Sequence, residues 1–341
     1  MSVDKGVGMG VDMGEGVDKR GEGAAGSARR ALAVLLALAL PALAPLGTAC
    51  SDAEPRDATH GTPRVDDGPL RVYAVNHPLA YFARRIGGDA VAVSFPAPAD
   101  VDPAFWSPQA ETVAAYQRAD LILLNGFGYA RWVARASLPR KTQVDTAAGL
   151  DGRAIPIADD VTHIHGPEGD DSHGELAFTS WLDPLLAIEQ ARRIEQALAA
   201  ARPAEAPRFE AGFAALEADL LALDAAFARA TKELGETPLL FSHPVYQYLE
   251  RRYGLDARSL HWEPGVAPSE SDWRELDTLL AQHPARLMLW EAEPLADTRR
   301  ELEARGLGSV VFSPAGNRLA TGDFLEVMQA NAARLEQAAA P

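Results

Sequence analysis

From Leu70 onward, short apolar runs alternate with segments whose apolar residues recur every three or four positions. The runs predict strands and the spaced segments predict helices. Short apolar runs, of the kind that buried parallel strands form, occur at residues 70–75, 91–95 and 121–124. Between the first two runs, residues 79–86 have the three- and four-residue spacing of a helix, which two glycines then end. This alternation is typical of an α/β fold with a parallel sheet.

After Trp181-Leu182-Asp183-Pro184 the pattern changes to that of two long helices. The second begins at Pro207 and carries one apolar stripe made by Phe209, Phe213, Leu216, Leu220, Leu223 and Phe227. At 1.5 Å per residue, a helix from Pro207 to Leu234 would be roughly 40 Å long. Strand and helix patterns then resume at residues 238–241, 246–252, 286–290 and 309–312, with a closing helix from Phe324.

These patterns predict an α/β protein with two lobes, each with a parallel sheet, joined by one long linker helix. The first lobe would comprise residues 70–205, the linker helix 206–234 and the second lobe 235–341. Ligands of open α/β sheets bind beyond the carboxyl ends of the strands, so the residues that follow each strand are candidates for a binding site.

The first 49 residues have the order of a secretory signal. Arg29-Arg30 precede an apolar run at 31–46, and small residues then lead to Cys50. Two prolines interrupt the run, which falls short of the roughly 20 apolar residues of a spanning helix. We therefore expect cleavage of residues 1–49.

Cys50 is the only cysteine, so an intramolecular disulfide cannot form. It stands where a bacterial lipoprotein signal has its lipidated residue, and we expect a periplasmic lipoprotein anchored through Cys50 on a flexible tether of residues 50–69. Gly47 stands where such signals usually have Leu, which leaves simple cleavage and release open.

The net charge of −16 lies in the exported part, because the signal region carries five acids and five bases. Such a surface argues against nucleic acid and anionic membrane as partners and is compatible with attracting cations.

One acidic segment, residues 162–175, holds three of the eight histidines: His163, His165 and His173. Imidazole suits zinc, copper and nickel, and the segment has few apolar residues to bury. A divalent metal is one interpretation, and a solvated polar loop is the other.

Four segments resemble the solute-binding subunits of zinc and manganese ABC importers: residues 93–108, 119–126, 181–184 and 241–255, with His243 in the last. Their order and spacing agree from about Leu70 to Leu335. The resemblance implies a two-lobed, helix-linked fold, partner permease and ATPase subunits, and an acidic His-rich loop just before the second signature, where residues 162–175 stand.

The same resemblance shows two departures at the metal ligands. The family has a histidine after Asp-Pro, but Ala104 follows Asp102-Pro103 here. The family also has Asp-Pro-His-Val before the Trp, where this chain has Thr179 at the histidine position. His243 and Glu291 match the remaining ligands, and two ligands are too few for a tight tetrahedral site.

Other side chains are candidates for completing the site. His77, after the first strand, is one; the alternative is a histidine at a helix start that forms its hydrogen bonds with the backbone. The loop histidines His163, His165 and His173 are others. Secondary candidates are His261 and Glu263, although Trp262 between them indicates a segment that packs in the core instead. Glu293 is another, and its alternative is a solvent-exposed carboxylate at the rim of the site.

We expect a solute-binding protein and not an enzyme, because no Gly-x-Ser-x-Gly elbow or metal-activated base with a substrate pocket is evident. A monomer would bind Zn²⁺ first and Mn²⁺ second between its lobes and deliver it to the permease. The alternatives are a binding or interaction module that has lost its metal site, and a periplasmic buffer that uses only the His-rich loop.

Overall fold

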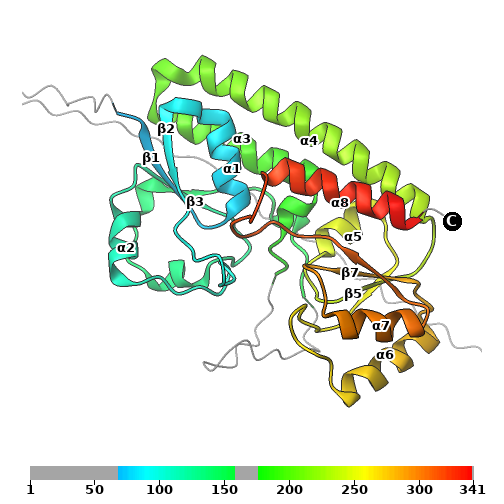
Figure 1. The fold of residues 1–341 in the computed structure, drawn as a ribbon. Coiled ribbons are helices and arrows are strands. Elements are labelled where there is room, and N and C mark those ends of the chain that lie inside the picture. The colour runs from blue at the N-terminus through cyan, green and yellow to red at the C-terminus, as the bar shows by residue number, and fades with distance from the viewer. Residues whose placement is uncertain (1–67, 158–175, 340–341) are drawn as a thin grey trace, which may run out of the picture. The chain divides into compact units, whose positions relative to one another are not determined.

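The structure is a computed structural model that describes residues 68–157 and 176–339 (Figure 1). Cys50, His163, His165 and His173 lie outside the described residues. Within these two ranges, each helix is too short or too polar to cross a membrane.

The first lobe contains a parallel sheet in the order β2-β1-β3-β4. Its strands are β1 Leu70–Ala74, β2 Val91–Ser94, β3 Leu121–Leu124 and β4 Gln143–Asp145. Helices α1 His77–Gly87 and α2 Ala110–Gln117 connect the first three strands. The side chain of Asn76 caps α1 by accepting a hydrogen bond from Leu79 N. The strands predicted at 70–75, 91–95 and 121–124 and the helix predicted at 79–86 are confirmed.

Two long helices follow the first sheet, as the pattern predicts. They are α3 Pro184–Ala201 and α4 Ala206–Leu234, the second of which has 29 residues. All six apolar residues of the predicted stripe of α4 are buried. Helix α4 packs against α1 and α3 of the first lobe and against α5 and α8, so it joins the two lobes (Figure 1).

The second lobe repeats the arrangement with a parallel sheet in the order β6-β5-β7-β8. Its strands are β5 Leu239–Phe241, β6 Ala257–Ser259, β7 Leu287–Trp290 and β8 Gly308–Val311. Its helices are α5 Gln247–Tyr253, α6 Glu270–Gln282 and α7 Ala296–Ala304, and α8 Phe324–Ala339 ends the described chain. The predicted fold of two α/β lobes joined by a long helix is confirmed.

Short 3-10 helices also occur in the connections of the described chain, at Gly88–Ala90, Arg131–Arg135, Arg140–Thr142, Asp151–Arg153, Ser180–Leu182 and Pro203–Glu205.

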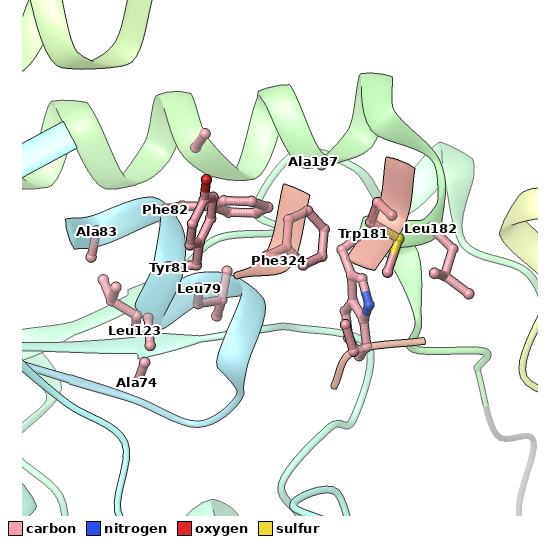
Figure 2. Close-up of a cluster of buried hydrophobic side chains, with 14 of the residues drawn as sticks. Ala74, Leu79, Tyr81, Phe82, Ala83, Leu123, Trp181, Leu182, Ala187 and Phe324 are labelled. Carbon is pink, nitrogen blue, oxygen red and sulfur yellow. The ribbon is translucent and has the colours of Figure 1, made fainter. Parts of the chain in front are cut away.

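The last helix returns to the first lobe. Phe324, at the start of α8, is fully buried against two aromatic residues of α1, with ring centroids 5.4 Å from Phe82 and 5.7 Å from Tyr81. Figure 2 shows these rings with Trp181, whose indole nitrogen donates to Pro314 O at 2.8 Å. The core of the first lobe is therefore completed by the end of the chain.

Candidate metal site

His243 and Glu291 lie at the carboxyl ends of neighbouring strands. His243 comes two residues after β5, and Glu291 directly follows β7. Ser242 N donates to Leu289 O at 2.9 Å, which extends the β5–β7 pairing up to the histidine. The imidazole Nδ1 and the carboxylate Oε1 are 3.4 Å apart, and both side chains are mostly buried, with 16% and 29% of their surface exposed. The structure thus brings together the two residues predicted as ligands from the family signatures.

A third strand brings His261 to the same place. His261 comes two residues after β6, and Trp262 N donates to Ser242 O at 2.7 Å, which fixes this segment beside β5. The rings of His261 and His243 are 5.9 Å apart and nearly perpendicular. Glu263, in the same segment, is exposed and acts electrostatically on Glu291. The carboxyl ends of β6, β5 and β7 therefore bring the two imidazoles and Glu291 to one side of the sheet, with the charge of Glu263 acting on Glu291.

Glu291 has a strongly perturbed carboxyl group. Burial, together with the negative charges of Glu263 and Asp102, raises the pKa of Glu291 to about 8. A carboxyl group that is held protonated by burial and like charges is stabilised in its ionised form by a cation. Perturbation of this kind is typical of binding and catalytic sites.

Asp102 is the residue of this site that the candidates omit. It belongs to the first lobe, and its negative charge contributes to the raised pKa of Glu291 in the second lobe. Its Oδ1 accepts a hydrogen bond from Ala104 N at 2.8 Å. The sequence did contain a signal for Asp102, because it is the Asp of the Asp-Pro pair in the first signature. In that signature, however, the metal ligand is the residue after the proline, so Asp102 itself was not a candidate.

The two positions that have lost histidine are both occupied in other ways. Ala104 is 1% exposed and is part of the first-lobe core. Thr179 is also buried, and its hydroxyl donates to Val245 O at 2.5 Å, two residues after His243. Thr179 therefore links the second signature of the first lobe to the second lobe directly.

Two other candidates lie elsewhere. His77 begins α1, its backbone N donates to Gly316 O at 3.0 Å, and the charges of Arg84 and Asp323 act on its ring. Burial lowers the pKa of His77. Glu293 is 65% exposed and forms an ion pair with Arg299. Glu293 is thus a rim carboxylate, and His77 lines a separate cavity.

Among the residues that the structure describes, no three His, Cys, Asp or Glu side chains are placed to hold one metal ion. The described part of the cleft therefore supplies an incomplete ligand set.

A contact between the two lobes involves the described residues that flank the segment of the loop histidines. Pro156 and Leu176 form an antiparallel bridge, and Ala177 N donates to Ile155 O at 2.8 Å. The hydroxyl of Tyr248, on α5 of the second lobe, donates to Ala177 O at 3.0 Å. The described residues that flank the segment are thus paired with each other and in contact with the second lobe.

Comparison with solved structures finds the same fold at low sequence identity. The Zn(II)-bound ZnuA-like domain of Streptococcus pneumoniae AdcA is 22% identical, with a TM-score of 0.67 over 79% of this chain and 98% of that one. The metal-dependent lipoprotein YcdH from Bacillus subtilis is 21% identical, with a TM-score of 0.67 and coverage of 79% and 98%. Pseudomonas aeruginosa FpvC in complex with Mn²⁺ is 22% identical, with a TM-score of 0.61 and the same coverage. The chain spans only 57% of the longer AdcA structure.

A protein family matches nearly all of the two lobes. Its model, described as the zinc-uptake complex component A, periplasmic (ZnuA), covers residues 72–338. Members of this family are periplasmic substrate-binding components and not enzymes. Imidazole and carboxylate, the groups of His243 and Glu291, are donor types that suit a metal. The chain belongs to the ZnuA family and is a solute-binding protein of the metal-import type.

Proposed function

We propose that this protein binds a divalent transition metal between its lobes, zinc first and manganese second, and delivers it to the permease of an ABC importer. The observation that carries the proposal is the approach of His243 Nδ1 and Glu291 Oε1 to 3.4 Å at the ends of two adjacent strands. A metal ion coordinated by both would replace the repulsion among Glu291, Glu263 and Asp102 with attraction.

The donor types favour zinc. Imidazole nitrogen and carboxylate oxygen are both common zinc ligands, whereas sites made only of carboxylate, carbonyl and water oxygens suit manganese better. Two relatives are consistent with this range, since the ZnuA-like domain of AdcA is Zn(II)-bound and FpvC is in complex with Mn²⁺. His261 adds a second imidazole to the second-lobe side of the site.

We assign the missing ligands to Asp102 and to the histidines His163, His165 and His173. Ala104 has no ligand atom in its side chain, and the hydroxyl of Thr179 is committed to Val245 O. A segment as long as 158–175 can extend roughly 25–30 Å and return at about 3.3 Å per residue. Three residues separate the segment from Thr179, whose hydroxyl donates to Val245 O, so a chain of this length would be long enough to bring a loop histidine to His243.

Delivery to a permease fits a protein held at the membrane. Cys50 would carry the lipid, and residues 51–69, rich in Pro, Asp, Gly and Thr, would form the tether to the first lobe. Cys50→Ser should then move the protein from the membrane fraction to the soluble fraction.

The test is metal affinity in the exported chain. His243→Ala should weaken zinc more than about tenfold, because one ligand contributes at least about 1.4 kcal/mol. Deletion of 162–175 should also abolish tight binding if the loop completes the cleft. His60→Ala, in the tether, is the matched control and should bind as the parent does. Wild-type calorimetric affinity in His243→Ala would contradict a cleft site.

The metal-buffer alternative is favoured by one observation, the absence of a three-ligand group among the described residues. In that case deletion of 162–175 would remove all zinc binding, while His243→Ala and Glu291→Gln would leave it unchanged. The two functions therefore predict opposite results for the second-lobe variants.

A further inference from the structure

A cavity apart from the candidate metal-site residues lies at the edge of the first sheet. Its volume is about 700 Å³ and it is bounded by β1, edge strand β2, α1, α2 and the segment 318–322 that leads into α8. His243, Glu291, Glu263 and Asp102 are not among its lining residues. The cavity therefore needs an explanation of its own.

Two arginines from distant parts of the chain line this cavity. Arg84 Nη2 donates to Val93 O at 3.3 Å, and Arg318 Nη2 donates to Phe95 O at 2.7 Å. These bonds hold both guanidinium groups beside the carboxyl end of β2. Burial and the nearby charge of Arg318 together lower the pKa of Arg84, which shows that the two cations repel each other.

The two arginines also lack the usual acidic partners. Other arginines of the described chain, such as Arg71, Arg85 and Arg252, form ion pairs with aspartates. Within residues 68–157 and 176–339, neither Arg84 nor Arg318 forms an ion pair. Five N–H donors on each guanidinium group, with one used for a backbone carbonyl, leave capacity for a bidentate ligand.

Neutral polar groups complete the lining. Ser94, Thr112 and His77 line the cavity, and the buried Nδ1 of His77 has no hydrogen-bond partner among the described residues. Glu111 is the one carboxylate in the lining, and its side chain is exposed. The two cations therefore outnumber the single anion, in a chain whose net charge is −16.

The wall that carries Arg318 is held in place. Asn317 Nδ2 donates to Pro98 O at 2.8 Å and to Val101 O at 2.7 Å, which fixes the segment against the first lobe. At the other end, Asp323 and Glu326 cap α8 reciprocally, each accepting a hydrogen bond from the other's backbone N. A ligand would not have to order this wall, so binding would cost little conformational entropy there.

We propose that the cavity binds a small oxyanion with at least two negative charges, such as phosphate or a dicarboxylate. Two guanidinium groups match the paired oxygens of such a ligand, and Ser94 and Thr112 add hydroxyl donors. A cation would be repelled by Arg84 and Arg318. Nonspecific attraction does not explain anion binding to a chain of net charge −16, so binding would depend on the local pair of arginines.

The experiment is equilibrium dialysis of the exported chain with radiolabelled phosphate and, separately, succinate, at constant ionic strength in chloride. We expect saturable binding of one anion per chain. Arg84→Gln and Arg318→Gln should each weaken it about tenfold or more, because a hydrogen bond to a charged group contributes at least about 1.5 kcal/mol. Arg118→Gln, an exposed arginine at the end of α2 and outside the cavity, should bind as the wild type does.

Preference for phosphate over succinate, or the reverse, would identify the oxyanion class. Absence of saturable binding of both anions would overturn the proposal, as would wild-type affinity in both arginine variants. Glutamine is shorter than arginine, so Arg318→Gln loses the bond to Phe95 O; if that variant melts earlier, Arg84→Gln decides. Zinc affinity should stay unchanged in Arg84→Gln, so the test is independent of the metal site.

Discussion

Glu291 is surrounded by groups that oppose its ionisation, and this has a consequence for stability. The folded protein raises its pKa from 4.5 to about 8, so the folded state holds this proton more tightly than the unfolded chain does. The stabilising contribution is complete below about pH 4.5 and is lost as the pH rises through 8. Metal-free protein should therefore become less stable between pH 5 and 9, by on the order of a few kcal/mol from this group.

Urea unfolding at pH 5, 7 and 9 checks this prediction. Glu291→Gln should remove most of the loss, since glutamine does not ionise. Glu293→Gln, at an exposed neighbouring carboxylate, is the control and should follow the wild type. Parallel pH profiles for wild type and Glu291→Gln would contradict the assigned cause.

Thr179 can be tested with two substitutions that separate shape from hydrogen bonding. Thr179→Val keeps the shape and removes the hydroxyl, which leaves Val245 O without this donor in a partly buried place. We expect a loss of about 1–3 kcal/mol in the free energy of unfolding. Thr179→Ser keeps the donor and should lose less; equal losses in the two variants would show that packing, and not the hydrogen bond, matters at this position.

Some residues of the site were predictable from the sequence and others were not. His243 and Glu291 follow clear apolar runs and match family signatures, so their strand-end positions could be anticipated. Asp102 could not, because its approach to Glu291 depends on how the two lobes meet. The sequence shows that Thr179 replaces a histidine, but the bond to Val245 O requires the tertiary structure.

At the scale of elements, one glycine sets the distance between α1 and α4. A Cβ at Gly212 would lie 2.9 Å from Ile86 Cα and closer still to the Ile86 carbonyl oxygen, both of which are backbone atoms. Alanine favours an isolated helix over glycine by about 1 kcal/mol. Here the contact between helices should dominate.

We expect Gly212→Ala to lower the free energy of unfolding by about 1–3 kcal/mol, the usual cost of overpacking. Thermal or urea denaturation measures this directly. Gly265→Ala is the control, because a Cβ there meets no atom within 4 Å, and it should be near neutral. An increase in stability for Gly212→Ala would show that the two helices separate easily.

Strand β4 and helices α2 and α6 escaped prediction, and each has a weak pattern; in α6, for example, only Leu276 is buried. Strand β4 has three residues, Gln143-Val144-Asp145, with one apolar side chain, so it forms no apolar run. Helix α2 buries only Tyr116, which leaves no stripe to detect. By contrast, α4 buries a long stripe against α1, α3 and α8, and its predicted start and end agree with the structure to within one residue. Burial on one face is what makes an element visible in sequence.

For the whole molecule, the contact of α8 with the first lobe links the two ends of the described chain. Phe324→Ala should lower the free energy of unfolding by about 3–5 kcal/mol, because it empties a fully buried ring position. Hydrogen exchange gives the more specific measurement. Amides of β1 and β3 should lose protection although the substitution lies in the last helix, and unchanged exchange there would contradict the role of α8 in closing the first lobe.

This arrangement has a consequence for the order in which the protein is made. A ribosome releases β1, α1 and β3 long before Phe324, so the nascent first lobe has an uncovered apolar face beside Phe82 and Tyr81. Domains generally fold as units while they emerge from the N-terminus, but the first lobe cannot pack Phe82 and Tyr81 against Phe324 until α8 has been made. Synthesis alone therefore delays its folding. A polypeptide that must cross a membrane unfolded would gain time for export from the position of its final helix.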